Sequence, residues 1–344
     1  MKTVAVTASR SYDVYIGSGL ITHVGDYIRS LGKIQRVCIV SDSNVFPLYG
    51  TAVKNSLANA DLETSEFIFP AGEASKNGAT YLALVNHLAE HRLTRNDMIL
   101  ALGGGVVGDL AGFAAATYLR GIRFVQVPTT LLAAVDSSVG GKTAIDLPAG
   151  KNLAGAFCQP SLVLCDTSTL NTLPEEIFRD GCAEVIKYGI LYDPALFQTL
   201  CEDGPDFDRE SVISRCVELK RDVVAEDEFD TGSRMKLNLG HTVGHGIEAC
   251  SNFAISHGKA VAAGISIVAR ASHCPDADRI IACLERFGLP TSAEYAADDL
   301  ADWALSDKKR EGGTVNMIIP RAIGNCEIVP TPVDNLKTFI GEGL

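Results

Sequence analysis

The sequence has no long uninterrupted hydrophobic segment. Its longest apolar stretches are broken by Asp109 or Arg270, and its first ten residues, MKTVAVTASR, contain no apolar core of signal-peptide length. A membrane-spanning helix needs about 20 consecutive apolar residues, and a secretory signal needs an apolar core near its start. We therefore expect a cytoplasmic protein that has no membrane partner.

Paired cysteines and an excess of positive charge are also missing. None of the ten cysteines stands in a C-x-x-C pair, and Cys38 and Cys165 lie inside apolar, strand-like runs. This pattern favours buried reduced thiols over a disulfide framework or a zinc ribbon. The net charge of -12 disfavours nucleic acid as a partner. An anionic substrate would therefore need a local cluster of basic residues.

The order of the expected strands and helices changes near Pro174. Before it, short β-rich runs closed by Gly, Pro or Thr alternate with helical periods such as 79–93, which predicts a mainly parallel sheet covered on both faces. After it, helical segments follow one another, and only 314–320 and 325–330 resemble strands. A chain of 344 residues is expected to form two domains. We predict an α/β domain over 1–174 and a mostly α-helical domain over 175–344.

A glycine-rich turn follows one of the apolar strands. Residues 103–108 fit the pattern G-x-G-x-x-G and precede a helical period. Glycines let a backbone approach a pyrophosphate, and the helix N-terminus supplies N–H groups. The turn departs from the usual fingerprint because it lies outside the first βα unit and no acidic residue ends the next strand. Asp42, which ends an earlier strand, can serve the ribose hydroxyls instead. A plain tight turn stays open as an alternative.

Hydroxyl groups, glycines and two lysines form a second cluster. It runs over 129–132, 136–143 and 150–152, and it contains Lys142 and Lys151. Such groups after a strand end suit a phosphate or a polyol. A glycine-rich loop with solvated lysines is the alternative.

A third cluster offers metal ligands. His241 and His245 are four residues apart and so share one helix face. His257 lies on a separate segment, and Glu184 and Lys187 are three residues apart in an earlier helix. One carboxylate and two imidazoles would hold a catalytic divalent metal with open positions for substrate oxygens. The alternatives are a surface Glu184–Lys187 ion pair and histidines that only cap or pack helices.

Several long motifs closely resemble the 3-dehydroquinate synthase family, part of the sugar-phosphate cyclase superfamily. They occur in the family's order along nearly the whole chain: GGGVVGDLAGFAAATYLRG, VPTTLLAAVDSSVGGKTAIDLPAGKN, AEVIKYGI, RMKLNLGHTVGHGIEA and SDKKREGG. The resemblance implies an NAD-binding α/β domain, a helical metal- and substrate-binding domain, and a homodimer. It implies a carbon–oxygen lyase of the shikimate pathway, which serves aromatic amino acid biosynthesis.

The implied reaction converts 3-deoxy-D-arabino-heptulosonate 7-phosphate to 3-dehydroquinate and phosphate. In this family it proceeds by NAD-mediated transient oxidation, phosphate elimination, re-reduction, ring opening and aldol closure. The chain departs from the family in having Lys259 where many members have glutamate and Leu239 where phenylalanine is common. Neither position is an expected ligand.

The resemblance also implies the role of individual residues. A zinc or cobalt ion is expected at Glu184, His241 and His257. The NAD site is expected at Asp42, Asn44, Glu73, Lys76, Gly104, Gly105, Val106, Asp109, Thr129, Thr130, Asp136, Lys142, Lys151, Thr172 and Leu173. The substrate phosphate is expected near Lys142, Asn152, Asn238, His245 and Lys308, and near Arg120 of the second subunit. The rest of the substrate is expected near Lys151, Lys187, Lys220 and Arg234.

Three other functions stay open from the sequence. The first is an NAD- and metal-dependent polyol or glycerol-phosphate dehydrogenase, which would produce NADH. The second is a cyclase that acts on sedoheptulose 7-phosphate or glucose 6-phosphate. The third is a catalytically inactive protein that binds NAD.

Overall fold

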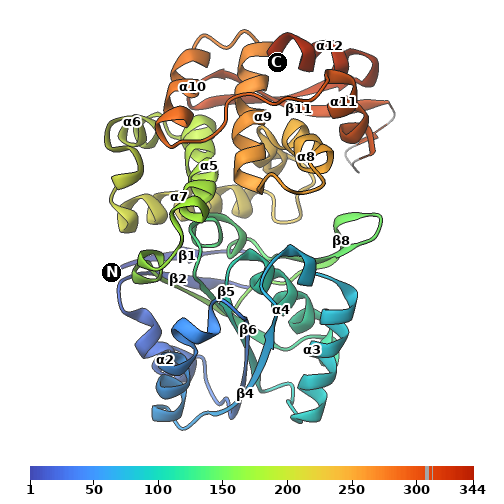
Figure 1. The fold of residues 1–344 in the computed structure, drawn as a ribbon. Helices are drawn as coiled ribbons and strands as arrows, with labels where there is room; N and C mark the ends of the chain where they lie inside the picture. Colours follow the sequence, from blue (N-terminus) through green and yellow to red (C-terminus); the bar gives the residue numbers. More distant parts are fainter. Residues whose placement is uncertain (307–309, 312) are drawn as a thin grey trace. The chain divides into compact units, whose positions relative to one another are not determined.

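The computed structural model describes residues 1–306, 310–311 and 313–344 (Figure 1). The chain divides into two compact units. The first comprises Met1–Leu173 and Arg209–Phe229, and the second comprises Pro174–Asp208 and Asp230–Leu344. The division therefore differs from the expected one because helix α7 (Arg209–Glu226) contacts β1 and belongs to the first unit. A boundary drawn on helical content alone could not reveal that contact.

The first unit is built on a seven-stranded sheet with the strand order β1-β2-β9-β6-β5-β3-β4. All neighbouring strands are parallel except β1 and β2, which form an antiparallel pair. The mainly parallel sheet predicted from the sequence is thus confirmed. The strands are β1 (Lys2–Val6), β2 (Tyr12–Gly17), β3 (Arg36–Asp42), β4 (Glu63–Phe69), β5 (Met98–Gly103), β6 (Arg123–Pro128) and β9 (Leu162–Asp166).

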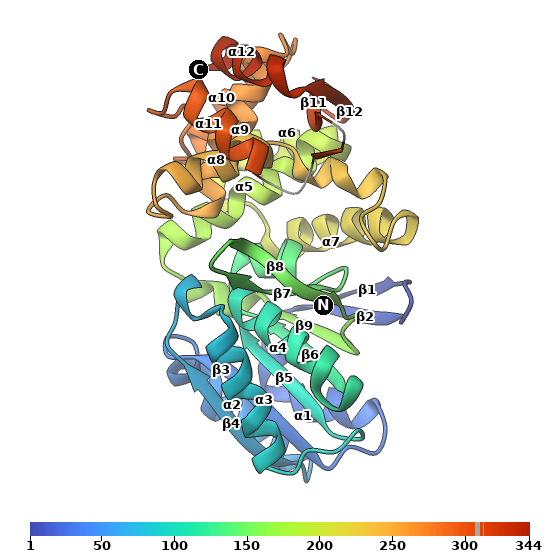
Figure 2. The same ribbon diagram turned by 90° about the vertical axis from the view of Figure 1, so that its right-hand side faces the viewer.

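Two hydrophobic cores lie on opposite faces of this sheet. Ile99 and Ala101 of β5 pack with helices α3 (Gly78–Glu90) and α4 (Gly105–Thr117). The alternate residues Leu100 and Leu102 pack on the other face with α1 (Val24–Ser30) and α2 (Phe46–Asn59). Figure 1 shows α2 on one side of the strands and α3 and α4 on the other, and Figure 2 looks onto the face that α3 and α4 cover. Every residue of β5 is buried, as expected for a central strand covered on both faces.

A separate antiparallel hairpin contains much of the second cluster of the sequence. Its strands are β7 (Lys142–Leu147) and β8 (Gly150–Phe157), and β7 contacts α4. A glycine-rich loop was the alternative expected here. The segment is instead partly extended. The two strands can lie close together because Gly155 has no side chain, which would meet the Thr143 carbonyl oxygen at 2.2 Å.

The second unit is mostly helical, as predicted. Its helices are α5 (Glu175–Tyr192), α6 (Pro194–Asp203), α8 (His241–Cys250), α9 (His257–Ala271), α10 (Ala277–Arg286), α11 (Ala297–Ser306) and α12 (Val333–Gly343). A small antiparallel sheet contains β10 (Arg310–Glu311), β11 (Thr314–Ala322) and β12 (Asn325–Pro332). Helix α9 is buried along nearly its whole length and contacts α5, α8 and α12.

No helix in the described part of the chain combines the length and the apolar character that crossing a bilayer requires. All ten cysteines are free and most are buried, which agrees with the expected reduced thiols.

Candidate functional site

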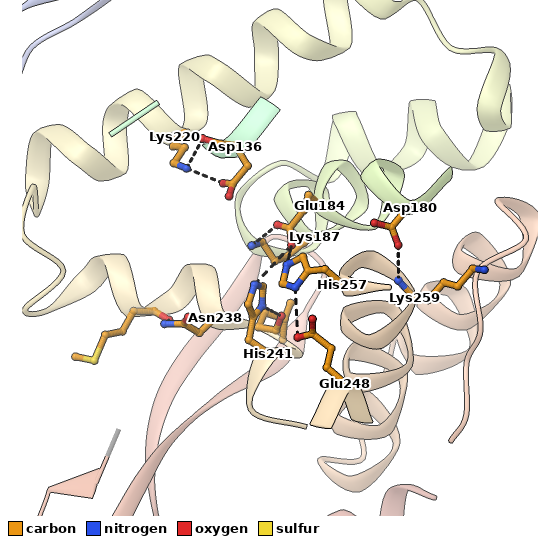
Figure 3. Close-up of polar contacts among 12 residues, drawn as sticks. Asp136, Asp180, Glu184, Lys187, Lys220, Asn238, His241, Glu248, His257 and Lys259 are labelled. Atoms are coloured by element: carbon orange, nitrogen blue, oxygen red, sulfur yellow. Dashed lines mark hydrogen bonds and ion pairs between the residues drawn. The ribbon is translucent and has the colours of Figure 1, made fainter. Parts of the chain in front are cut away.

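Three helices of the second unit bring one carboxylate and two imidazoles together. Oε1 of Glu184, on α5, lies 3.6 Å from Nε2 of His241 on α8 and 3.4 Å from Nε2 of His257 on α9 (Figure 3). Zinc bonds to nitrogen and oxygen are about 2.0–2.1 Å long, so donors of a tetrahedral ion lie about 3.3 Å apart. The separations in this cluster are close to that value. The donor set therefore fits zinc or cobalt.

Glycines allow the three helices to come this close. A side chain at Gly258 would meet the Asp180 carbonyl oxygen of α5 at 1.9 Å, and one at Gly264 would meet the Gly240 carbonyl oxygen at 2.1 Å. Gly240 also has a φ of 77°, a left-handed conformation that favours glycine. Backbone contacts therefore hold α9 against both α5 and the start of α8.

The start of α9 is capped by a residue of another helix. Oδ1 of Asp180 accepts hydrogen bonds from Ser256 Oγ at 2.5 Å and from the Lys259 backbone N–H at 3.0 Å. The first N–H groups of a helix have no partner within the helix, so the carboxylate stabilises this end. Because Asp180 lies one turn before Glu184, the cap sets α9, and with it His257, against the helix that carries Glu184.

The ring of His241 is oriented by the backbone. Its Nδ1 lies 3.1 Å from the Leu239 carbonyl oxygen, and a carbonyl only accepts, so Nδ1 donates. The lone pair is then on Nε2, which faces Glu184. A metal-binding histidine is commonly fixed in this manner.

Lys187 forms an ion pair with Oε2 of Glu184, and both side chains are 1% exposed. The Glu184–Lys187 ion pair therefore exists, but it is buried, and the alternative of a surface ion pair is wrong. One oxygen of Glu184 faces Lys187 and the other faces the two histidines.

His257 lies between two buried carboxylates, Glu184 and Glu248. Burial opposes protonation of the ring, but hydrogen bonds and charge interactions with the two carboxylates outweigh it and raise the pKa of His257 to about 10. Metal binding to Nε2 would displace a proton from this ring.

Arg234, Asn238 and His245 are the other expected residues of the second unit that the structure describes. Arg234 is 1% exposed and belongs to a short helical turn over Ser233–Asn238, in which Nδ2 of Asn238 donates to the Met235 carbonyl at 3.1 Å. The His245 ring centroid lies 5.6 Å from that of His241 and 6.4 Å from that of His257. Lys308 lies outside the described residues.

The glycine turn of the first unit lies at the carboxyl end of β5. Gly103 ends this strand and α4 begins at Gly105. The chain leaves β3 toward β4 on one side and leaves β5 toward β6 on the other, and α2 and α4 lie on opposite faces. The carboxyl ends of β3 and β5 thus flank a topological switch point, the usual ligand site of open α/β sheets.

Expected nucleotide residues occur on both sides of this switch point. Asp42 ends β3, where its Oδ1 accepts from the backbone N–H groups of Asn44 and Val45 at 2.8 and 2.9 Å. Thr129 follows β6, and its backbone N–H donates to the Gly103 carbonyl at 3.0 Å. The Thr129 hydroxyl is buried and has no hydrogen-bond partner among the described residues.

A second group of expected residues forms a network in the first unit. Nζ of Lys76 lies 2.6 Å from Oδ2 of Asp109, 2.5 Å from Oδ1 of Asn152 and 4.0 Å from Oε1 of Glu73. Burial raises the pKa of Asp109 and of Glu73, although Lys76 acts in the opposite direction. The network joins three residues expected at NAD with one expected at the substrate phosphate.

Lys220 and Asp136, expected at the substrate and at NAD, bind each other. Nζ of Lys220 donates to Oδ1 of Asp136 at 2.8 Å and to its carbonyl oxygen at 2.6 Å (Figure 3). This contact adds to those with β1 that hold α7 on the first unit.

The remaining expected residues are more dispersed within the first unit. Gly104 closely approaches Thr130, since a side chain there would lie 3.0 Å from the threonine methyl group. The hydroxyl of Thr172 pairs with that of Tyr49. Arg120 and Lys142 are exposed, and Val106, Lys151 and Leu173 are half-buried.

The sequence alone did not reveal the roles of two residues of the second unit, Glu248 and Asp180. Glu248 is buried and lies seven residues after His241, a spacing that places both on one face of α8. That spacing could have revealed it. Asp180 gave no comparable signal, because its capping role depends on contact between two helices.

The fold and the cluster place the chain in a class of two-unit synthases. Its structure is similar to a 2-deoxy-scyllo-inosose synthase complexed with carbaglucose-6-phosphate, NAD+ and Co2+, at a TM-score of 0.90 and 26% identity over 100% of both chains. It is also similar to ValA, a 2-epi-5-epi-valiolone synthase from Streptomyces hygroscopicus with NAD+ and Zn2+ bound. That match has a TM-score of 0.88 and 25% identity over 98% of this chain and 99% of the other.

The chain belongs to the 3-dehydroquinate synthase family. The 3-dehydroquinate synthase N-terminal family matches residues 66–180, and the C-terminal family matches residues 181–310. A 3-dehydroquinate synthase of Pelobacter propionicus is 47% identical over 96% of each chain. The resemblance stated from the sequence is thus confirmed.

Proposed function

We propose that the chain acts as a 3-dehydroquinate synthase, dependent on NAD and on a divalent metal. The reaction converts 3-deoxy-D-arabino-heptulosonate 7-phosphate to 3-dehydroquinate and phosphate. The convergence of Glu184, His241 and His257 carries this proposal, since their spacing fits a catalytic metal. Family membership and the NAD+ and metal held by similar solved structures support it.

The two groups would supply the chemistry that side chains lack. Bound NAD+ would supply a reversible hydride acceptor, and a metal at Glu184, His241 and His257 would supply a Lewis acid for adjacent hydroxyls. Lys187 would hold Glu184 in place, because its Nζ pairs with Oε2 inside the protein. The protein would otherwise act mainly through position and fixed charge.

We assign the substrate's carboxylate to Arg234 and its phosphate to the basic hairpin. Arg234 is buried, and a guanidinium pairs with carboxylate through two parallel hydrogen bonds. Lys142 begins β7, and Asn152 is the third residue of β8, directly after Lys151, which is expected at the rest of the substrate.

NAD is assigned to the switch point of the first unit. The backbone of Gly104 and Gly105 at the start of α4 would receive the pyrophosphate, and Asp42 would receive the ribose hydroxyls.

The cytoplasmic location expected from the sequence stays a prediction.

The test of this function is a direct assay with three sugar phosphates. Purified protein, NAD+ and zinc are incubated with the heptulosonate phosphate, with sedoheptulose 7-phosphate or with glucose 6-phosphate, while phosphate release and cyclic product are measured. We expect turnover of the heptulosonate alone. Efficient use of sedoheptulose 7-phosphate with little use of the heptulosonate would contradict the substrate assignment and leave only the cyclase class.

We also propose a homodimer in which Arg120 reaches the phosphate of the neighbouring subunit. Arg120 is exposed and follows α4 in a left-handed conformation, with φ of 65°. Inactive Arg120→Ala and His245→Ala subunits, when mixed, should regenerate some active sites. Complete failure in verified mixed dimers would contradict a shared site.

A further inference from the structure

Glu248 is a buried carboxylate to which neither the expected ligand set nor the proposed mechanism gives a role. It is 3% exposed and lies on α8, on the same helix face as His241. A carboxylate is rarely buried to this extent unless it is paired. Its neighbour in the cluster is the ring of His257 on α9 (Figure 3).

The two nitrogens of His257 face different carboxylates. Nε2 lies 3.4 Å from Oε1 of Glu184, and Nδ1 lies 3.6 Å from Oε2 of Glu248. The second distance is that of an ion pair, and a small rotation of either side chain would shorten it to a hydrogen bond. If the ring turned over by 180°, both nitrogens would be replaced by carbon atoms at these positions. Glu248 therefore distinguishes the two ring orientations.

His241 shows the same arrangement with a different acceptor. Its Nε2 faces Glu184 at 3.6 Å, and its Nδ1 donates to the Leu239 carbonyl at 3.1 Å. In both histidines, Nε2 points toward the common carboxylate and Nδ1 points toward an acceptor outside the expected donor set. The acceptor of His241 is the backbone, whereas the acceptor of His257 is a side chain that mutation can remove.

We propose that Glu248 is the positioning residue of His257. It accepts a hydrogen bond from Nδ1–H and thereby presents the Nε2 lone pair to the metal. This inference rests on the proposed metal role of Glu184, His241 and His257. Loss of such a partner typically weakens metal affinity by about tenfold to a hundredfold, because the ligand loses its orientation and part of its basicity.

A second cation position is the competing use of the same atoms. Donor atoms of His245, Glu248 and His257 also lie within 4.8 Å of one another. A cation there would need Nδ1 of His257 as a ligand, so it excludes the proposed hydrogen bond. We assign the first cation to Glu184, His241 and His257, because the rings of His241 and His257 lie closer, at 5.2 Å between centroids, than those of His245 and His257 at 6.4 Å.

The test measures Co2+ affinity and stoichiometry by visible absorption, with a competing chelator, for the wild type and three variants. Glu248→Ala should bind one Co2+ per chain about tenfold to a hundredfold more weakly. Glu248→Gln keeps an acceptor without the charge and should restore part of that loss. Glu176→Gln, which removes an exposed carboxylate paired with Lys259, should bind like the wild type.

The outcomes separate this inference from the proposed function. A wild type that binds no Co2+ would defeat the metal centre as a whole. Unchanged affinity in Glu248→Ala, with a wild type that binds one Co2+, would overturn only the role of Glu248. If Glu248→Ala does not fold, Glu248→Leu, which fills the space without an oxygen acceptor, replaces it with the same expected loss and the same contradicting result. Two Co2+ per chain in the wild type and one in Glu248→Gln would replace the hydrogen bond by a second cation site.

Discussion

The two units use their charged residues in different ways. In the second unit, Glu184, His241 and His257 come from three helices and aim donor atoms at one another across 3.4 to 3.6 Å. In the first unit, the expected site lysines Lys76 and Lys220 are held by carboxylates of the same unit. The first arrangement suits a cation, which would lie between donor atoms that otherwise repel one another or share a proton. The second stabilises the fold around the glycine turn, to which we assign backbone contacts with NAD.

This difference explains where substitutions should act. A metal centre is specified by side chains, so a single change of ligand should abolish it. A pyrophosphate site at a helix N-terminus depends on N–H groups, so its paired side chains should matter more for folding than for chemistry. The following experiments test that contrast, from the largest expected effect to the smallest.

Removal of the metal or of one ligand should have the largest effect. Exhaustive chelation should abolish turnover, and zinc or cobalt should restore it. Alanine at Glu184, His241 or His257 should lose the metal, measured by metal content after dialysis, whereas His245→Ala should keep the metal and lose activity. Full activity in a preparation shown to be metal-free would refute the metal centre. An empty site in His245→Ala would show that the wrong histidine of α8 was chosen.

Loss of the buried guanidinium should affect the substrate and leave the metal in place. A hydrogen bond to a charged group contributes about 1.5–3 kcal/mol. We therefore expect Arg234→Ala to lower kcat/KM for the heptulosonate phosphate by at least about tenfold to a hundredfold. Metal content should equal that of the wild type. Unchanged kcat/KM would remove Arg234 from the substrate site.

In the first unit, the expected effect of breaking an ion pair is on stability. Asp109→Asn leaves Lys76, which is 5% exposed, without its carboxylate partner at 2.6 Å. Removal of one member of a buried pair lowers the free energy of unfolding by about 3–5 kcal/mol. Because Lys76 keeps its bond to Asn152, we expect a loss near the lower end of this range. Glu66→Gln, which breaks the more exposed Lys54–Glu66 pair, should change the free energy of unfolding by less than about 1 kcal/mol.

Urea unfolding of the two variants and the wild type provides the comparison. Equal stability of Asp109→Asn and the wild type, together with much weaker NAD+ binding, would contradict the contrast between the units. It would show that Asp109 acts at the nucleotide, as the family resemblance implies, and not mainly on stability.

Patterns along the chain predicted the elements better than the contacts between them. The alternation of strands and helices predicted the parallel sheet, and the four-residue spacing of His241 and His245 predicted their common helix face. Spacing could not choose between these two histidines, because the choice depends on how α8 lies against α5. The family resemblance supplied that choice, and the structure brings His241, not His245, next to Glu184.

The misplaced features all depend on contacts between distant segments. Helix α7 reads as one more helix of the C-terminal half, yet its contacts with β1 and the bond from Lys220 to Asp136, 84 residues away, place it in the first unit. The Glu184–Lys187 pair has the spacing of a surface pair, yet other helices bury it. Asp180 caps a helix that begins far along the chain. Local periodicity carries no information on such contacts.

The most direct test of the account follows NADH during turnover. The proposed reaction takes a hydride and returns it, so NAD is a catalyst without net redox change. We predict that cyclic product and phosphate form in large excess over a trace of added NAD+, with no accumulating absorbance from NADH. Formation of NADH in step with substrate consumption would contradict the synthase and make the chain a metal-dependent polyol dehydrogenase.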